Sequence, residues 1–334
     1  MAVSPNTDNY TLGKGVVYFN EEVNNVYQGE RDLGNAPEFT FNVAIEKLEH
    51  YSSRGGLRAK DKEIISEITP GVAFTLDEIN KQNLALLTLA DINEVVQTAG
   101  YVSAEVVASA NLGMRAQLDN REIGTIFLAT GAFTGGPFTI GETITGGTSA
   151  ATGILVQATD STGIWVAVTS GTFDEATELL TGGTSSATAT SSAVGVWTPG
   201  VLLVQDDADT VTYVAGTDYE VSTALQDDHI GRIKFLDGGT LTEGEEVHVT
   251  YGYAAVTYNE IRAFTKTSIE GFLRFVSDNP AGNQQELEIW RVSLTPSGDT
   301  AMIGEDWSTL GFTGEILKDE TGHPNSPYFN IVMS

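Results

Sequence analysis

Residues 38–46 read EFTFNVAIE, and this stretch decides the fold class of the chain. Between Phe39 and Ile45 every second side chain is large and apolar, and the side chains between them are small or polar. Alternation with a period of two is typical of a β-strand with one buried face and one polar face. The alternation slips at Leu48, which indicates a β-bulge or the end of packing.

The segment that follows predicts a partner for this strand. Residues 52–62 read SSRGGLRAKDK, a glycine-containing run that is dense in charge, and residues 63–68 again have the composition of a strand. Two strands around a polar Gly-Gly segment predict either a long hairpin or an extended loop. A turn signal at Pro70-Gly71 then precedes another alternating run over residues 72–76.

The rest of the chain is dominated by strand patterns. Residues 77–90 contain good helix formers near helical spacing, although Asn83 interrupts the apolar stripe, and they predict the longest helix of the protein. Beyond Asp91, short apolar runs alternate with turn signals, as in sandwiches and barrels. Because the helices that a parallel α/β fold requires are missing, we expect a mainly β fold.

Residues 132–197 differ in composition from the chain on either side. They contain no Lys or Arg and consist mostly of Gly, Ser, Thr and Ala. Residues 145–152 (TGGTSAAT) return 36 positions later as residues 181–188 (TGGTSSAT), and each copy follows a glutamate by three positions, Glu142 and Glu178. This pattern predicts an inserted, internally duplicated small β domain.

Length and composition allow two domains. With 334 residues and 41% hydrophobic content, the chain has enough apolar material for a large core. Surface loops accept insertions at a modest entropic cost. We therefore expect a discontinuous main domain over 1–131 and 198–334, with 132–197 projecting from it.

Charge and residue usage limit the classes of function. A net charge of −28 disfavours general affinity for nucleic acid, because Lys and Arg must neutralise phosphates for tight binding. An acidic surface repels DNA, which is useful in a conduit through which DNA slides, although high charge also simply keeps a protein soluble. The absence of cysteine excludes disulfides and thiolate metal sites. The sequence has neither the pattern of a signal peptide at its start nor an apolar run of about 18 residues, so we expect no membrane association.

Motifs for catalysis or metal binding are not apparent. The four histidines, His50, His229, His248 and His323, are far apart in sequence and lack paired spacing. The acidic runs at residues 206–209 and 227–228 offer oxygen ligands for a hard cation, but the first lacks the glycine and distal glutamate of an EF-hand loop, and a solvated turn is the simpler interpretation. No nucleophile elbow, P-loop or dinucleotide fingerprint is present, so the sequence predicts no enzyme, metal or cofactor.

A basic cluster stands out in this acidic chain. One interpretation is a solvated hairpin tip. The other is an intersubunit arm, whose positive charge finds an acidic complement on a neighbouring copy and sets the register between copies. The residues concerned are Lys47, Arg54, Arg58, Lys60 and Lys62.

Several segments, taken in order, resemble the major tail proteins, or tail tube proteins, of long-tailed bacteriophages. The likeness rests on pattern and order and covers most of the chain outside 132–197. The segments are residues 9–19 (NYTLGKGVVYF), 34–41 (GNAPEFTF), 70–76 (PGVAFTL), 270–275 (EGFLRF), 290–292 (WRV), 294–296 (LTP) and 303–307 (IGEDW).

This resemblance implies a β-sandwich with one flanking helix and a long arm at about 48–63. Subunits of that family form hexameric rings, and hairpins from the subunits join into an inner β-barrel. The rings stack into a tube that carries double-stranded DNA during ejection. The tube meets tape measure, terminator and tip proteins, belongs to the virion and is assembled in the host cytoplasm. The acidic residues expected to face the DNA are Glu46, Glu49, Glu63 and Glu67.

The inserted segment leaves two functional readings open. On a tube it must point outward, because it would otherwise block the bore, and a decorated exterior favours a non-contractile tail without a sheath. There it either stabilises the particle or contacts the host surface. The alternative is a β-modular surface adhesin or carbohydrate-binding protein in which the insert carries the function. A β-rich carbohydrate hydrolase is a third class, and it requires a carboxylate pair in a cleft.

Overall fold

The computed structural model describes residues 9–333 and confirms the mainly β fold, with antiparallel sheets and, among these residues, two short α-helices. The chain forms two compact units. Unit 1 comprises the described residues up to Glu94 and those from Asn259 onward, and unit 2 comprises Val95–Tyr258. The chain passes between the units twice, in β6 (Asp91–Gln97) and β20 (Val256–Arg262), which pair with each other.

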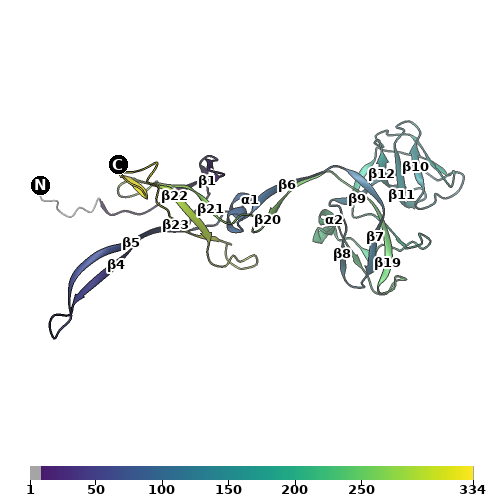
Figure 1. Cartoon of the computed structure of the whole chain (residues 1–334). Helices are drawn as coiled ribbons and strands as arrows, with labels where there is room; N and C mark the ends of the chain where they lie inside the picture. The colour runs from purple at the N-terminus through teal and green to yellow at the C-terminus, as the bar shows by residue number, and fades with distance from the viewer. Residues whose placement is uncertain (1–8, 334) are drawn as a thin grey trace. The chain divides into compact units, whose positions relative to one another are not determined.

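Unit 1 is built on a nine-stranded sheet (Figure 1). Its strand order is β2-β1-β21-β22-β23-β5-β4, with β3 beside β1 and β24 beside β22. The strands are β1 (Gly15–Val23), β2 (Val26–Tyr27), β3 (Arg31–Asp32), β4 (Glu38–Ser52), β5 (Ala59–Leu76), β21 (Ile269–Ser277), β22 (Gln285–Pro296), β23 (Leu310–Ile316) and β24 (Phe329–Met333).

Side chains of this sheet form the core of unit 1 together with α1 (Lys81–Leu87). Val17 and Phe19 of β1 are buried in the same apolar cluster as Leu86 of α1. Phe74 of β5 stacks on Phe312 of β23, with ring centroids 5.2 Å apart. The core therefore fixes the inner end of β5, from which the β4–β5 hairpin extends.

The helix α1 is shorter than the expected 77–90, although it is the longest helix in the described part of the chain. It begins after Asn80, whose side chain accepts a hydrogen bond from the Asn83 amide (2.8 Å), and it ends at Leu87, with Thr88 as its C-cap. Asn83, which interrupts the apolar stripe, is buried because its amide group is satisfied there. It donates to the carbonyls of Leu33 and Glu78 and accepts from Arg31.

Unit 2 contains a ten-stranded sheet and a separate three-stranded sheet. The large sheet has the order β14-β13-β10-β11-β12-β9-β19-β16, with β15 beside β9 and β7 beside β19, and the small one has the order β17-β18-β8. The elements are β7 (Gly100–Ala110), β8 (Arg115–Gln117), β9 (Ile123–Ala129), β10 (Thr143–Gly146), β11 (Thr152–Thr159), β12 (Gly163–Ser170), β13 (Leu179–Gly182), β14 (Thr188–Thr190), β15 (Val196–Pro199), β16 (Leu203–Asp206), β17 (Tyr219–Glu220), η2 (Thr223–Leu225), α2 (Asp227–Ile230), β18 (Arg232–Phe235) and β19 (Glu245–Tyr253).

The boundaries expected from composition differ from those of the compact units. The expected insert, 132–197, lies inside unit 2 and shares its large sheet. β9 precedes the segment in sequence, yet it pairs with β12 from Ala129↔Gly163 to Ile126↔Val166. Leu128 of β9 is buried in the same cluster as the apolar side chains of the segment. β9 therefore contributes a strand and core contacts to the segment 132–197. The change in composition near residue 132 does not coincide with a boundary in the fold.

The two copies of the repeat form a pair of turns related by local twofold symmetry. β10 pairs antiparallel with β13, and Thr145 lies opposite Thr181 at the centre of the pairing. Ile144 pairs with Gly182 on one side of this centre, and Gly146 pairs with Leu180 on the other. Because Ile144 and Leu180 are equivalent positions of the two copies, as are Gly146 and Gly182, the two contacts are equivalent. The duplication in sequence is therefore a duplication in structure.

Glu142 and Glu178 hold these turns crosswise. Glu142, before the first copy, accepts hydrogen bonds from the amides of Thr184 (2.9 Å) and Ser185 (2.8 Å) in the second copy. Glu178, before the second copy, accepts from the amide (3.2 Å) and hydroxyl (2.8 Å) of Ser149 in the first. Both glutamates are buried. Burial acts to raise the pKa of the Glu142 carboxyl, but the hydrogen bonds from Ser185 and its neighbours outweigh burial and lower that pKa below its usual value.

Candidate functional site

β4 and β5 form a long hairpin, so the open choice between a hairpin and an extended loop is settled. The two strands pair from Glu38 to Ser52 of β4, with two β-bulges. The first bulge interrupts the pairing between residues 46 and 47 of β4, and its extra residue is Ser66 of β5, so the bulge lies near the slip at Leu48 but on the partner strand. Figure 1 shows the hairpin extending away from the other strands of unit 1.

Only the inner part of this hairpin is packed. Phe41 is half-buried, but Val43 and Ile45, which continue the same face of β4, are each 47% exposed. Ile65 and Ile68 of β5 are exposed beside them. The expectation that this face is buried as far as Ile45 is therefore wrong for a single chain, because beyond Phe41 the side chains of β4 are no longer covered by unit 1.

Farther out, the same face carries a ladder of ion pairs. Glu49 lies directly opposite Glu63, and Lys60 pairs with both carboxylates. Lys47 pairs with Glu63 (2.5 Å), and the Tyr51 hydroxyl donates to Glu49 (2.6 Å). The hydrogen bonds from Lys47 and then Lys60 lower the pKa of Glu63 to about 2. These pairs are solvent-exposed, so they order the hairpin more than they stabilise it.

The four acidic candidates do not share one face. Glu46 and Glu49 are three positions apart in β4, and since side chains alternate along a strand, they point to opposite faces. Glu46 lies directly opposite Glu67, whereas Glu49 lies opposite Glu63. The four glutamates expected to line one bore therefore divide into two pairs: Glu46 and Glu67 share one face without a lysine partner, whereas Glu49 and Glu63 lie on the other face and are paired with lysines.

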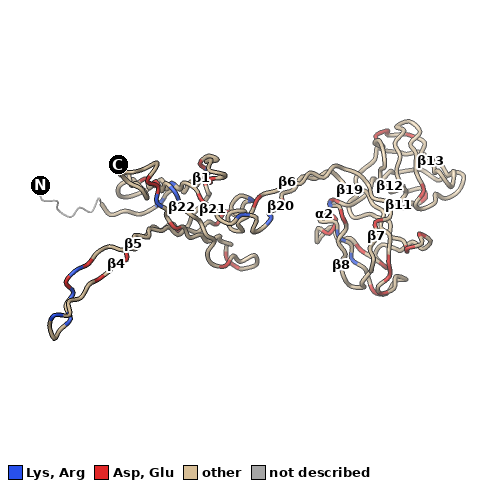
Figure 2. The backbone as a smooth tube through the Cα atoms, in the orientation of Figure 1, with Lys and Arg blue, Asp and Glu red and all other residues tan. Residues whose placement is uncertain are grey.

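The five basic candidates also separate. Lys47 and Lys60 belong to the ladder, and Arg58 stacks over the Tyr51 ring, 5.4 Å from its centroid. Arg54 and Lys62 make no ion pair within residues 9–333 and are exposed. Figure 2 shows the basic residues near the end of the hairpin. The basic cluster predicted from sequence therefore lies in the outer part of the hairpin. Some of its charges are neutralised by carboxylates of the hairpin, and others have no ion-pair partner in the described part of the chain.

β4 is also the edge strand of the nine-stranded sheet. It is 15 residues long, and one side of its backbone has no partner strand in the described part of the chain. A long edge with exposed apolar side chains is a template for pairing with another chain. The hairpin therefore combines unpaired backbone, uncovered apolar side chains and separated charges.

The other residues considered from sequence are occupied by local contacts. The Nδ1 atom of each histidine lies 2.5–2.9 Å from a carboxylate oxygen, in the pairs His50–Asp61, His229–Glu122, His248–Asp209 and His323–Asp319. Within residues 9–333 no group of three or more His, Cys, Asp or Glu residues is arranged to hold a metal ion.

The two acidic runs have different structural roles. Asp206 accepts hydrogen bonds from the amides of Thr210 (2.6 Å) and Val211 (2.7 Å), as expected of a turn. Asp227 is instead buried, and its two carboxylate oxygens accept from Arg115 and Arg232 at 2.9 Å each. The simple turn interpretation therefore holds for the first run, whereas the second contains a buried carboxylate paired with two partly exposed arginines, which sequence reasoning missed.

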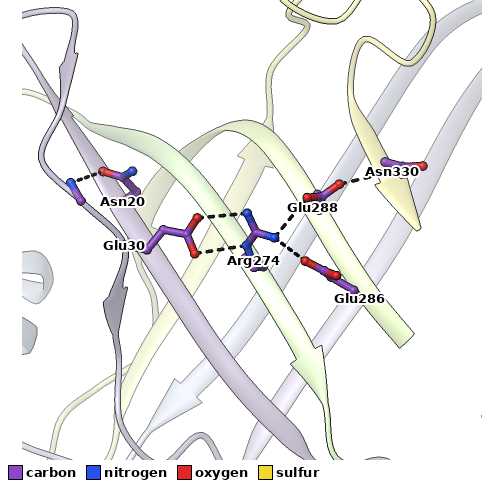
Figure 3. A network of polar contacts seen from close by, with 7 residues as sticks. Asn20, Glu30, Arg274, Glu286, Glu288 and Asn330 are labelled. Carbon is purple, nitrogen blue, oxygen red and sulfur yellow. Dashed lines mark hydrogen bonds and ion pairs between the residues drawn. The ribbon is translucent and has the colours of Figure 1, made fainter. Parts of the chain in front are cut away.

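A second network that sequence reasoning missed is centred on Arg274 in unit 1 (Figure 3). Its guanidinium makes a bidentate contact with Glu30 (3.0 and 3.1 Å) and also contacts Glu286 and Glu288. The Asn330 amide reaches Glu288 at 3.5 Å. The network ties the segment between β2 and β3 to β21, β22 and β24, so we assign it a structural role. Its partners are far apart in sequence, and no local signal marks them.

Unit 2 contains a groove of about 750 Å³. It is lined by Trp197, Tyr253, Ile126 and the segment 168–174. Thr125 also lines the groove, and its buried hydroxyl has no hydrogen-bond partner in the described part of the chain. A pocket of this size with aromatic walls is suited to a small organic ligand or a sugar.

Three further observations bear on the class of protein. In the part of the chain that the structure describes, no helix has the length and apolar character needed to cross a membrane. No curated protein matches the sequence. A family of proteins of unknown function, UCP028589, matches residues 10–169 and 162–332. Because these matches cover nearly the whole chain, it belongs to the family of proteins of unknown function UCP028589.

Proposed function

We propose that this protein is a structural virion subunit that assembles into stacked hexameric rings and forms the tail tube of a long-tailed bacteriophage. The observation that carries the proposal is the β4–β5 hairpin, whose edge strand is unpaired and whose apolar side chains Val43, Ile45 and Ile68 are uncovered. A surface of this kind is costly on a monomer, since it invites aggregation. It becomes useful when copies of the chain pair edge to edge in a closed ring, because closure removes the exposed edges.

The charge of the hairpin fits a conduit for DNA. Glu46 and Glu67 lie directly opposite each other, and no cation pairs with either among the described residues. Like charges in such a position destabilise a strand pair by roughly 0.2–1 kcal/mol. In the proposed tube these two glutamates line the bore. They and the overall charge of −28 repel the phosphates of double-stranded DNA, so that the DNA slides through without adhesion.

In this proposal the protein has no catalytic activity. Its partners are copies of itself, the tape measure protein, and the terminator and tip proteins, with DNA only in transit. The protein is assembled in the host cytoplasm and belongs to the virion. Unit 2 lies on the outside of the tube, where it favours a non-contractile tail.

A second candidate is a β-modular surface adhesin or carbohydrate-binding protein. It is favoured by the groove of unit 2, because Trp197 and Tyr253 offer aromatic faces for sugar rings. Glycan-array binding that is lost in a Trp197→Ala variant, with the protein monomeric throughout, would select this candidate over the tube.

The experiment that tests the first proposal places charges on the uncovered hairpin. The variant Val43→Asp/Ile45→Asp is compared by sedimentation velocity with the wild type and with Val106→Asp, a control at a 56% exposed valine in β7 of unit 2. We expect the wild type and the control to form rings or larger assemblies and the hairpin variant to remain a monomer with an unchanged circular dichroism spectrum. Equal assembly of the hairpin variant and the control would refute this role of the hairpin.

A further inference from the structure

The loop between β22 and β23, residues 297–309, exposes an unusual group of apolar side chains and is called the apolar loop here. Ile303 is 97% exposed and Trp307 is 93% exposed, and Met302 between β22 and β23 is similarly uncovered. Fully solvated tryptophan is uncommon on a monomer and is enriched at the centres of protein interfaces. The loop therefore has the composition of a contact site that lacks its partner in the single chain.

The charges of the apolar loop are all of one sign. Asp299, Glu305 and Asp306 lie in residues 297–309, and the loop contains no Lys or Arg. No ion pair involves these three acids in the described part of the chain. An acidic rim around exposed apolar side chains calls for a partner that is both basic and apolar.

The turn region of the β4–β5 hairpin, residues 52–62, called the hairpin tip, has this complementary composition. It contains four basic residues and one acidic residue, and Leu57 at its centre is 86% exposed. Arg54 and Lys62 form no ion pair within residues 9–333. The hairpin tip therefore presents an apolar side chain flanked by available cations.

A single chain does not bring these two surfaces together. Leu310, directly after the apolar loop, pairs with Leu76 at the inner end of β5, whereas the hairpin tip begins before Ala59 at the other end of the same strand. These ends are 17 positions apart (76 and 59), which corresponds to about 55 Å along a β-strand. The hairpin tip and the apolar loop thus lie at opposite ends of β5.

We propose that the hairpin tip of one copy docks on the apolar loop of a second copy, so that copies associate head to tail. This inference rests on the proposed self-assembly and names the acceptor of the hairpin tip. Leu57 packs against Trp307 and Ile303, while Arg54 and Lys62 meet the acidic rim of the loop. Since the two surfaces differ, the contact is heterologous and has a direction, and its repetition builds a polar tube or a closed ring.

An exposed loop with tryptophan and isoleucine also has the composition of a segment that enters a membrane interface. The acidic rim disfavours that occupant, because the anionic lipids of a bilayer surface attract basic segments. The test therefore includes a lipid arm.

The test reverses the charges of each surface in the full-length protein. The variants are Glu305→Arg/Asp306→Arg in the apolar loop, Arg54→Glu/Lys62→Glu in the hairpin tip, and the combination of all four. A matched control, Asp207→Arg/Glu246→Arg, reverses two exposed acids of unit 2. All of these positions are exposed, so circular dichroism is expected to be unchanged.

Association is measured by sedimentation velocity in low salt, and the proximity of the two surfaces is measured by cross-linking and mass spectrometry. We expect each reversed pair to weaken association at least 10-fold, the combination to return to within about 3-fold of the wild type, and the control to have no effect. Trp307→Ala should weaken association about 30-fold, the ratio expected for a central interface tryptophan. Cross-links should join Lys60 or Lys62 of one copy to the acidic loop residues of another.

The outcomes separate the two proposals. If the wild type assembles and the loop variants assemble equally well, the docking inference is overturned while the tube proposal stands. If the wild type does not self-associate at any concentration, both proposals fall. If Trp307→Ala abolishes flotation with vesicles of phosphatidylcholine and phosphatidylglycerol but leaves assembly intact, the loop serves a membrane and the inference is refuted.

Discussion

The crosswise contacts of Glu142 and Glu178 allow a quantitative prediction, because the two glutamates are symmetry mates with unequal numbers of hydrogen bonds. The Glu142 carboxylate accepts from the amides of Thr139 (2.7 Å), Thr184 (2.9 Å) and Ser185 (2.8 Å) and from the Ser185 hydroxyl (2.7 Å). Among residues 9–333 the Glu178 carboxylate accepts only from the amide and hydroxyl of Ser149, and its buried Oε1 atom has no partner there.

The magnitudes follow from the donors that each substitution leaves unpaired. Glu142→Ala removes the acceptor of three part-buried backbone amides, and since water reaches part of each donor, each orphaned amide costs about 1–2 kcal/mol. Because the losses overlap, we expect a total of about 3–5 kcal/mol of unfolding free energy. Glu178→Ala orphans one amide and also removes a buried oxygen that has no partner, so we expect about 1–2 kcal/mol.

The assay is urea unfolding of the full-length protein, followed by circular dichroism, combined with hydrogen exchange of residues 182–188. Glu142→Ala should lose more stability than Glu178→Ala by about 2 kcal/mol and should accelerate exchange of the Thr184 and Ser185 amides. Equal losses in the two variants, or a larger loss for Glu178→Ala, would refute the hydrogen-bond accounting.

The same site predicts a dependence on pH. The folded-state pKa of Glu142 is lower than its unfolded value near 4.5, so its stabilisation is fully present above that value and is lost as the pH falls through the folded-state pKa. The stability difference between the wild type and Glu142→Gln should therefore be largest near neutrality and shrink below about pH 4. A difference that stays constant from pH 7 to pH 3 would contradict this assignment.

Three further predictions concern stability, each measured by thermal or urea unfolding. Gly182→Ala should cost about 1–3 kcal/mol, because a Cβ atom there would lie 2.6 Å from a carboxylate oxygen of the crosswise contact, whereas Gly131→Ala, with nothing within 4 Å, should be nearly neutral. Asp227→Ala should cost about 1–3 kcal/mol, since it leaves two partly exposed arginines without their buried carboxylate, and a loss below about 0.5 kcal/mol would contradict the role of this carboxylate. Arg274→Gln should cost about 1–2 kcal/mol, because three carboxylates lose their common cation, and a loss below about 0.5 kcal/mol would count against that network.

How far the sequence predicts this fold differs between its parts. The period of residues 38–46 predicts the strand, because alternation depends on local geometry, whereas the bulge nearest Leu48 has its extra residue, Ser66, in the partner strand β5. The repeat with its preceding glutamates predicts a duplicated unit, since identical turns require the same contacts. The unit boundary was not predictable from composition, because β9 lies outside the Gly- and Thr-rich segment yet completes its sheet and core.

The candidate site shows the same division. Alternation indicates which side chains share a face. It implies that Glu46 and Glu49, three positions apart in one strand, point to opposite faces, so the sequence alone argues against one shared acidic face. Alternation does not indicate whether anything covers a face, so the exposure of Val43 and Ile45 required the structure. The partners of Arg274 are brought together by strand pairing across distant segments, and no local pattern predicts such a network.

The central claim is that copies of this chain close into rings through the β4–β5 hairpin and stack into a tube. The most direct test is electron microscopy of the purified full-length protein, with class averages collected over a range of concentrations. We predict end views with sixfold symmetry around an open bore and side views of stacked rings. A monodisperse monomer at every concentration, with no ring in any class average, would contradict the account.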